Sequence, residues 1–137
     1  MPATHRTHAP DLGLAALREL HHDTYLRYAA LLLPAVGNAD RALRDAFADL
    51  ADSWHDALAT ASPVACAWQT VRHHVRTLAG PGPLGSVVHL TTDQQDLFLL
   101  YVVLDLSEQA IAALTGTEEA AVHTQILSLD TRPKPSR

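Results

Sequence analysis

The chain has little of several residue types on which common functions depend. Its 137 residues include one cysteine, Cys66, so the sequence offers neither an internal disulfide nor a cysteine framework for a metal. The longest apolar runs, 28–36 and 97–104, are much shorter than the roughly 20 residues of a membrane span. Residues 1–10 lack the apolar run of a signal peptide. We therefore expect a cytoplasmic protein without a membrane segment.

Lysine and arginine are absent from residues 81–129, although the chain has ten of these residues in all. The same stretch carries a net charge of -6, whereas residues 1–80 carry -1 and residues 130–137 carry +2. A DNA-binding domain usually presents a basic face. The charge pattern therefore argues against DNA binding by the C-terminal third of the chain.

Catalytic and phosphate-binding motifs are also missing. No Gly-x-Ser-x-Gly occurs, and the paired carboxylates belong to an ordinary solvated helix face. The stretch 80–85 is rich in glycine and proline, but its prolines lack amide donors and no Gly-Lys-Ser/Thr follows. We interpret it as a linker and predict that the protein is not an enzyme and has no small-molecule substrate.

Nine histidines do not combine into a metal site. His21-His22 and His73-His74 are adjacent pairs, and neighbours on a helix point about 100° apart. Only His5 and His8 have the spacing of two ligands on one helix face. We expect no metal and no cofactor. Cys66 is more typical of a core position than of a reactive thiol.

Three amphipathic helices are predicted in residues 11–80. The first covers about 11–33, and the second begins at Asn38, which can serve as its cap, and ends near residue 61. Ser62-Pro63 predicts the start of the third helix. Apolar positions at helical spacing predict the core. They are Leu14, Leu17, Leu20 or His21, Leu26 and Ala29, then Leu43, Phe47, Leu50, Trp54 and Leu58, then Trp68, Val71, Val75 and Leu78.

Three shorter helices are predicted in residues 90–129. Thr92 with Gln95 fits a capping box at the start of a helix that runs to about 104. Its segment 97–104 is apolar all round, which suits either a buried central helix or a pairing surface. Residues 107–114 and 117–129 then form a helix-turn-helix pattern around Gly116, with Thr117 as the cap of the last helix. Ile111, Leu114, Val122, Ile126 and Leu129 would face the core.

These elements predict an all-α fold of two small helical units joined by a Pro/Gly linker. The N-terminal three-helix unit covers 11–80, the linker 81–89, the C-terminal helix-turn-helix unit 90–129 and the tail 130–137. No strand signal occurs along the chain.

The C-terminal unit resembles the DNA-binding region 4 of extracytoplasmic-function sigma factors, which belong to the sigma-70 family. Leu106-Ser107, Ile111-Ala112, Leu114, Gly116 and Ala121-Val122 keep the family pattern, and 90–95 resembles its opening. The resemblance implies a bacterial transcription protein without catalytic activity. It also implies promoter contacts from the turn and the recognition helix, at Thr117, His123, Thr124 and Gln125.

Residues 22–54 resemble, more loosely, the polymerase-binding region of the same family, and residues 67–78 resemble the promoter-melting helix that follows it. The resemblance implies that the acidic face of the second helix docks on RNA polymerase, and Asp45, Asp49, Asp52 and Asp56 form one stripe there. A solvated face is the alternative. It also implies DNA contacts from Arg72, His73 and Arg76, on the only predicted helix with a basic surface and no acid.

The chain departs from the family pattern at three points. His123 and Gln125 stand where the family carries basic residues, and Ser128 and Asp130 fall where basic residues are usual. Ala110 replaces the usual glutamate. The ten residues 80–89 reach at most about 35 Å when fully extended, which is short for holding two distant promoter elements.

Two hypotheses follow. In the first, the chain is a sigma-factor-like protein that binds RNA polymerase core and acts in transcription initiation or its regulation. In the second, it is a degenerate sigma-like interaction module that binds polymerase or another regulatory protein and no DNA. The family resemblance favours the first and the charge pattern favours the second for residues 90–129.

Overall fold

The protein is all-helical in the computed structural model, which describes residues 2–80 and 90–130 and gives side chains for 13–80 and 90–129. The first three helices are α1 (Pro2–Leu32), α2 (Asn38–Leu58) and α3 (Pro63–Ala79). The next segment is α4 (Thr92–Phe98), which continues as the π-helical turn η2 (Leu99–Val103). The last two helices are α5 (Glu108–Thr115) and α6 (Glu119–Asp130). The predicted all-α class is confirmed, while the predicted linker 81–89 and the tail beyond residue 130 lie outside the described residues.

Helices α1, α2 and α3 pack around a core of aromatic and aliphatic side chains. Tyr25 and Tyr28 of α1 are fully buried and both contact the Trp68 ring of α3, at centroid distances of 6.4 and 4.9 Å. Phe47 and Trp54 of α2 are buried beside them. The predicted core positions are confirmed with two qualifications: Leu26 is only partly buried, and Leu20, Leu58 and Leu78 are exposed. At the position left open between Leu20 and His21, the structure buries His21.

Two predicted helix caps are each one residue away from the observed ones. Gly37, not Asn38, is the N-cap of α2, because the turn that enters this helix needs a left-handed residue (φ 87°). The capping box of α4 uses Thr91 and Gln94 instead of Thr92 and Gln95. The Ser62 cap of α3 is confirmed, since its hydroxyl accepts a 3.1 Å hydrogen bond from the Ala65 amide.

The helix-turn-helix of α5 and α6 is confirmed. The Ser107 hydroxyl caps α5, and Gly116 supplies the left-handed turn (φ 74°) after it. Thr117 was expected to cap α6, but that helix begins at Glu119, and the Thr117 hydroxyl lies 2.9 Å from that of Thr115. Ile111, Leu114, Val122 and Ile126 are buried as expected, and Leu129 is partly buried.

The apolar segment 97–104 is buried on one side only. Leu97, Leu99 and Leu100 are buried, whereas Val102 and Val103 are about half exposed. The α-helix widens into η2 here, with the Leu104 amide bonded to the Leu99 carbonyl at 2.9 Å. The sequence left two alternatives for this segment, a buried central helix and a pairing surface. The structure supports burial for the side of the segment that faces the neighbouring helices.

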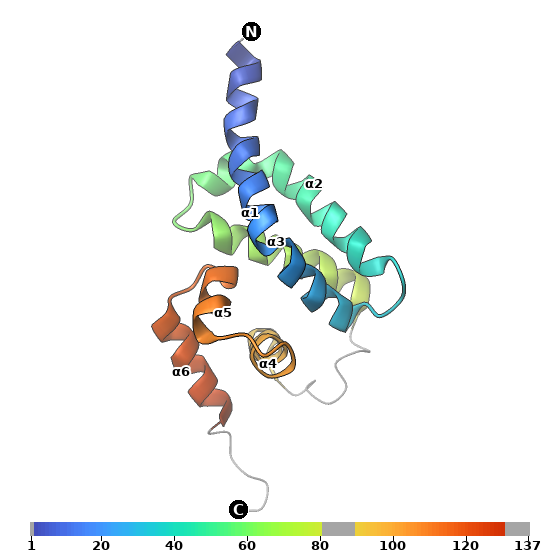
Figure 1. Cartoon of the computed structure of the whole chain (residues 1–137), viewed down its shortest axis with the longest axis vertical. Coiled ribbons are helices and arrows are strands. Elements are labelled where there is room, and N and C mark those ends of the chain that lie inside the picture. The colour runs from blue at the N-terminus through green and yellow to red at the C-terminus, as the bar shows by residue number, and fades with distance from the viewer. Residues whose placement is uncertain (1, 81–89, 131–137) are drawn as a thin grey trace, which may run out of the picture.

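The two helical units pack directly against each other. Figure 1 shows α5 next to the N-terminal half of α3, while α4, seen end-on, lies below α3. One core cluster includes buried residues of both units, among them Trp68, Leu97, Leu100 and Ile111. The contact between α3 and the C-terminal unit, called the seam below, therefore contains side chains from both units.

Candidate functional site

The basic side of α3 faces the start of α4. Arg72 and Arg76 are four residues apart and therefore lie on the same face of the helix. The Arg72 guanidinium donates to the Asp93 carboxylate at 2.6 Å and to the Asp96 carboxylate at 3.0 Å. The Arg76 guanidinium donates to the other Asp96 oxygen at 2.6 Å and to the Gln95 side-chain carbonyl at 3.0 Å. Both predicted DNA-contacting arginines are thus bound by the C-terminal unit of the same chain.

Asp96 is the centre of this network. Its side chain is only 5% exposed, and its carboxylate accepts a third donor, the Tyr28 hydroxyl, at 2.7 Å. Burying a carboxylate is costly unless it is paired and hydrogen-bonded, and here three donors from α1 and α3 satisfy it. Burial, and then the Asp96 charge, raise the pKa of the Tyr28 hydroxyl, so Tyr28 remains a proton donor.

The charges in the network balance. Two guanidinium groups, 18% and 19% exposed, face two carboxylates, of which Asp93 is 81% exposed. Burial lowers the pKa of the Arg72 guanidinium, but the hydrogen bonds to Asp93 and Asp96 outweigh it and raise the pKa. The α3 surface therefore presents little net positive charge in this conformation.

A second contact joins the turn of the helix-turn-helix to the other end of α3. A Cβ atom on Gly116 would overlap the backbone nitrogen of Ala65 and come within 2.7 Å of the Ser62 hydroxyl oxygen. Two features therefore require glycine at this position: its positive φ and the close approach of the N-terminus of α3. Both ends of α3 are thus covered by the C-terminal unit.

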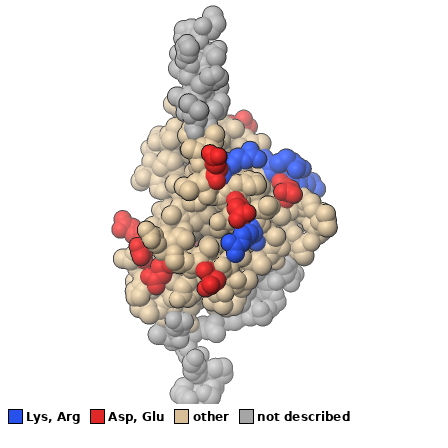
Figure 2. All heavy atoms as spheres, viewed as in Figure 1, with Lys and Arg blue, Asp and Glu red and all other residues tan. Residues whose placement is uncertain are grey.

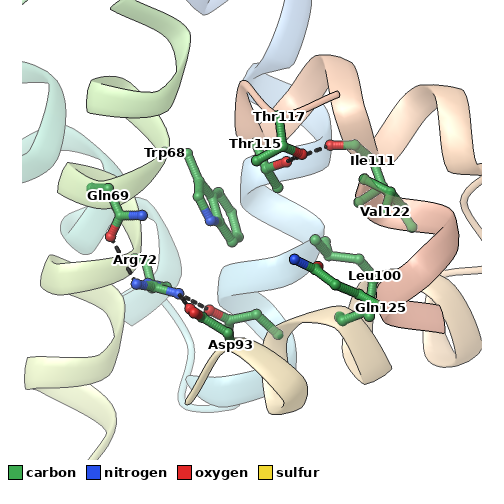
Figure 3. A pocket seen from close by; sticks show the side chains of 12 residues that line it. Trp68, Gln69, Arg72, Asp93, Leu100, Ile111, Thr115, Thr117, Val122 and Gln125 are labelled. Carbon is green, nitrogen blue, oxygen red and sulfur yellow. Dashed lines mark hydrogen bonds and ion pairs between the residues drawn. The ribbon is translucent and has the colours of Figure 1, made fainter. Parts of the chain in front are cut away.

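Between these two contacts lies a cavity of about 130 Å³, shown in Figure 3. Trp68 and Arg72 of α3 face Leu100, Val122 and other residues across it. Two predicted DNA-contacting residues, Thr117 and Gln125, also line it. The structure therefore brings Arg72, Arg76, Thr117 and Gln125 to one seam.

The other predicted DNA-contacting residues lie apart from the seam. His73 is exposed on α3, and its ring contacts that of His74. His123 of α6 pairs with Glu108 of α5 at 2.9 Å, and the Thr124 hydroxyl donates to the Ala120 carbonyl. Figure 2 shows acidic side chains and no lysine or arginine over α5 and α6 on the face in view. The DNA contacts assigned to these residues stay a prediction.

The acidic stripe of α2, made of Asp45, Asp49, Asp52 and Asp56, is exposed along its whole length. Asp49 lies 3.1 Å from the Nε2 atom of His74, which ties the stripe to α3 at one point. The other three carboxylates form no ion pair with any of the residues that the structure describes. The stripe is thus available to a partner, and its role in polymerase docking stays a prediction.

Sequence reasoning missed Tyr28, Asp93 and Asp96. Asp96 is a charged residue directly before the apolar run 97–104, and a carboxylate in such a place has to find donors when that run is buried. This was the available signal, but it could not identify the donors, which come from residues 28, 72 and 76.

Helix-turn-helix motifs like that of α5 and α6 occur in many DNA-binding transcription proteins. Residues 86–127 match the family model described as Sigma-70, region 4. This segment is therefore similar to sigma-70 region 4, and the resemblance that the sequence showed is confirmed for it. No curated protein and no solved structure matches the chain.

Among the described residues, no three histidine, cysteine, aspartate or glutamate side chains are grouped so that they could hold a metal ion. In the same part of the chain, no helix is both long enough and apolar enough to cross a membrane.

Proposed function

We propose that the protein is a non-catalytic, sigma-like regulator in the bacterial cytoplasm that binds RNA polymerase core through the acidic stripe of α2. The region 4 domain supports a role in transcription. The observation that carries the docking proposal is the exposed row of four carboxylates on one face of α2. Complementary charge speeds association with a basic partner surface.

In this proposal, α6 does not hold promoter DNA. Phosphate neutralisation by lysine and arginine supplies nearly all non-specific affinity for DNA, and residues 90–130 contain neither. His123, at a position where the family carries a basic residue, is paired with Glu108 instead. The region 4 domain would then act through protein contacts.

The second candidate is a sigma factor in the full sense, which contacts promoter DNA while bound to polymerase. One observation favours it: Arg72 and Arg76 lie side by side on the helix that resembles the promoter-melting region. In the described conformation these arginines are occupied, so this function requires the two units to separate.

The docking proposal is tested by charge reversal. Asp45→Lys with Asp49→Lys should leave the thermal midpoint nearly unchanged, because both side chains are exposed, and should abolish co-purification of core polymerase from the native cell. The matched control is Glu19→Lys with Asp23→Lys, which makes the same charge change at two exposed positions of α1. The control should retain polymerase.

Two results would overturn the proposal. If wild-type protein brings down no polymerase subunit, polymerase is not its partner. If the α2 variant retains polymerase as well as the α1 control does, the stripe is only a solvated face.

A further inference from the structure

The half-open cavity at the seam combines apolar and polar side chains in the way that small-molecule sites do. Its volume of about 130 Å³ approaches that of an apolar cavity that holds one benzene ring, about 150 Å³. Trp68 of α3 and Gln125 of α6 bring polar groups to it. Its apolar lining consists of buried side chains from the C-terminal unit, namely Leu97, Leu100, Ile111 and Val122. The cavity therefore has room for one small ring.

Trp68 brings to this cavity a hydrogen-bond donor that no protein group accepts. The residue is only 3% exposed, and its indole ring projects from α3 into the cavity (Figure 3). No hydrogen bond joins its N–H to any described residue. The N–H of a buried tryptophan usually has a partner, because an unpaired buried donor is costly. A ligand that places an acceptor in the cavity would satisfy this donor.

Other polar groups of the lining can receive a donor from the same ligand. Asp93 uses one carboxylate oxygen for Arg72, at 2.6 Å, and its second oxygen accepts no hydrogen bond from a described residue. Gln125 extends its side-chain amide toward the cavity (Figure 3), and an amide offers both a donor and an acceptor. A ligand that carries both a donor and an acceptor therefore finds a partner for each.

The charges around the cavity favour an uncharged ligand. Arg72 and Arg76 are paired with Asp93 and Asp96 at 2.6–3.0 Å, so the lining presents no net charge. An ion that entered would lose hydration without gaining an unpaired opposite charge. A neutral ring with polar groups on one edge incurs a much smaller cost, because hydrogen bonds replace those it made to water.

We propose that the cavity binds a single uncharged ring that carries a carbonyl group next to a ring N–H, as cyclic amides and pyrimidine bases do. The carbonyl oxygen accepts a hydrogen bond from the Trp68 indole, and the ring N–H donates to Asp93 or Gln125. The ring carbons cover Leu100 and Val122. This site does not depend on polymerase docking through α2, which uses a different part of the molecule.

The test is a titration of the isotope-labelled full-length chain with 2-pyridone, followed by proton–nitrogen NMR. The chain has two tryptophans, so the spectrum has two indole signals, which Trp54→Phe and Trp68→Phe assign. Trp54 is the internal control, because its N–H is also unpaired among the described residues but is fully buried and does not line the cavity. The Trp68 signal should move with a dissociation constant of about 1 mM, and the Trp54 signal should stay in place.

Two matched controls test the polar contacts. N-methyl-2-pyridone keeps the ring and the carbonyl but lacks the N–H, so it should bind at least about fivefold more weakly. Gln125→Ala should weaken 2-pyridone binding about threefold, because it removes one partner at the mouth of the cavity. Gln109→Ala makes the same change at an exposed position of α5 that does not line the cavity, and it should leave the affinity unchanged.

Water is the alternative occupant of the cavity. In that case both indole signals stay in place as 2-pyridone is added, and the proposal is overturned. Equal movement of the two signals, or equal affinity for 2-pyridone and its N-methyl derivative, overturns it as well. The titration uses the wild-type chain, and if Trp68→Phe fails to fold, Trp54→Phe alone assigns both signals.

Discussion

The Tyr28 hydroxyl donates a 2.7 Å hydrogen bond to the Asp96 carboxylate, across 68 positions of sequence. This bond joins the C-terminal part of α1 to α4, so a buried residue of the N-terminal unit contacts the segment that matches sigma-70 region 4. Trp68 contacts the Tyr28 ring at a centroid distance of 4.9 Å and lines the cavity beside Asp96. The two units therefore share both polar and apolar contacts.

We predict that Tyr28→Phe lowers the free energy of unfolding by about 1.5–3 kcal/mol, the usual contribution of a hydrogen bond to a charged group. Tyr25→Phe is the matched control, because the Tyr25 hydroxyl is also buried but has no hydrogen-bond partner among the described residues. Its unfolding free energy should stay the same or rise. Urea titration of both variants measures the difference, and equal losses would show that the Asp96 bond contributes nothing.

Gly116→Ala should destabilise the protein more than Gly37→Ala. Both glycines have positive φ, 74° and 87°, so each alanine incurs the left-handed cost of about 1–2 kcal/mol. Only at Gly116 does the new Cβ overlap the α3 backbone, since nothing lies within 4 Å of a Cβ at Gly37. Urea midpoints of the two variants provide the comparison. Similar midpoints would show that the turn can move away from α3 without lowering the stability of the protein.

Stability should fall as the pH drops below about 6.5, in part because of His21. Burial lowers the pKa of its imidazole from 6.5, so at mildly acidic pH the unfolded chain binds a proton that the folded chain does not. Stability therefore rises with pH between the lowered value and 6.5. His21→Leu should flatten this slope in urea titrations repeated across that window. An unaltered slope in His21→Leu would contradict the assignment.

Asp105→Gly should raise the free energy of unfolding by up to about 1 kcal/mol. Asp105 has φ 59°, a left-handed conformation that costs an aspartate more than a glycine, at the end of η2. Its side chain is exposed, so little packing is lost. A thermal melt that shows a lower midpoint for the variant would mean that the carboxylate contributes at this turn.

Local signals in the sequence were enough to predict the helices and most of the core. Ser62-Pro63 and Ser107 predicted the starts of α3 and α5, because a hydroxyl that caps a helix acts on amides two or three residues away. The spacing of Ile111, Leu114, Val122 and Ile126 predicted their burial. The cap of α2 was missed by one residue because it depends on the left-handed backbone at Gly37, which no side-chain pattern marks. The cap of α4 was missed because either of the adjacent threonines, Thr91 and Thr92, could serve.

The sequence by itself also determined that residues 90–130 contain no lysine or arginine, and hence that the segment similar to sigma-70 region 4 has no such side chain to offer DNA. Only the tertiary structure decided where the arginines of α3 point. Ion pairs such as Arg72–Asp96 and Arg76–Asp96 join residues 24 and 20 positions apart, across a stretch with no periodic pattern to relate them. The packing of Trp68 against the C-terminal unit brings the arginines of α3 close to Asp96. Apolar burial drives this packing, and the opposite charges then attract one another at short range.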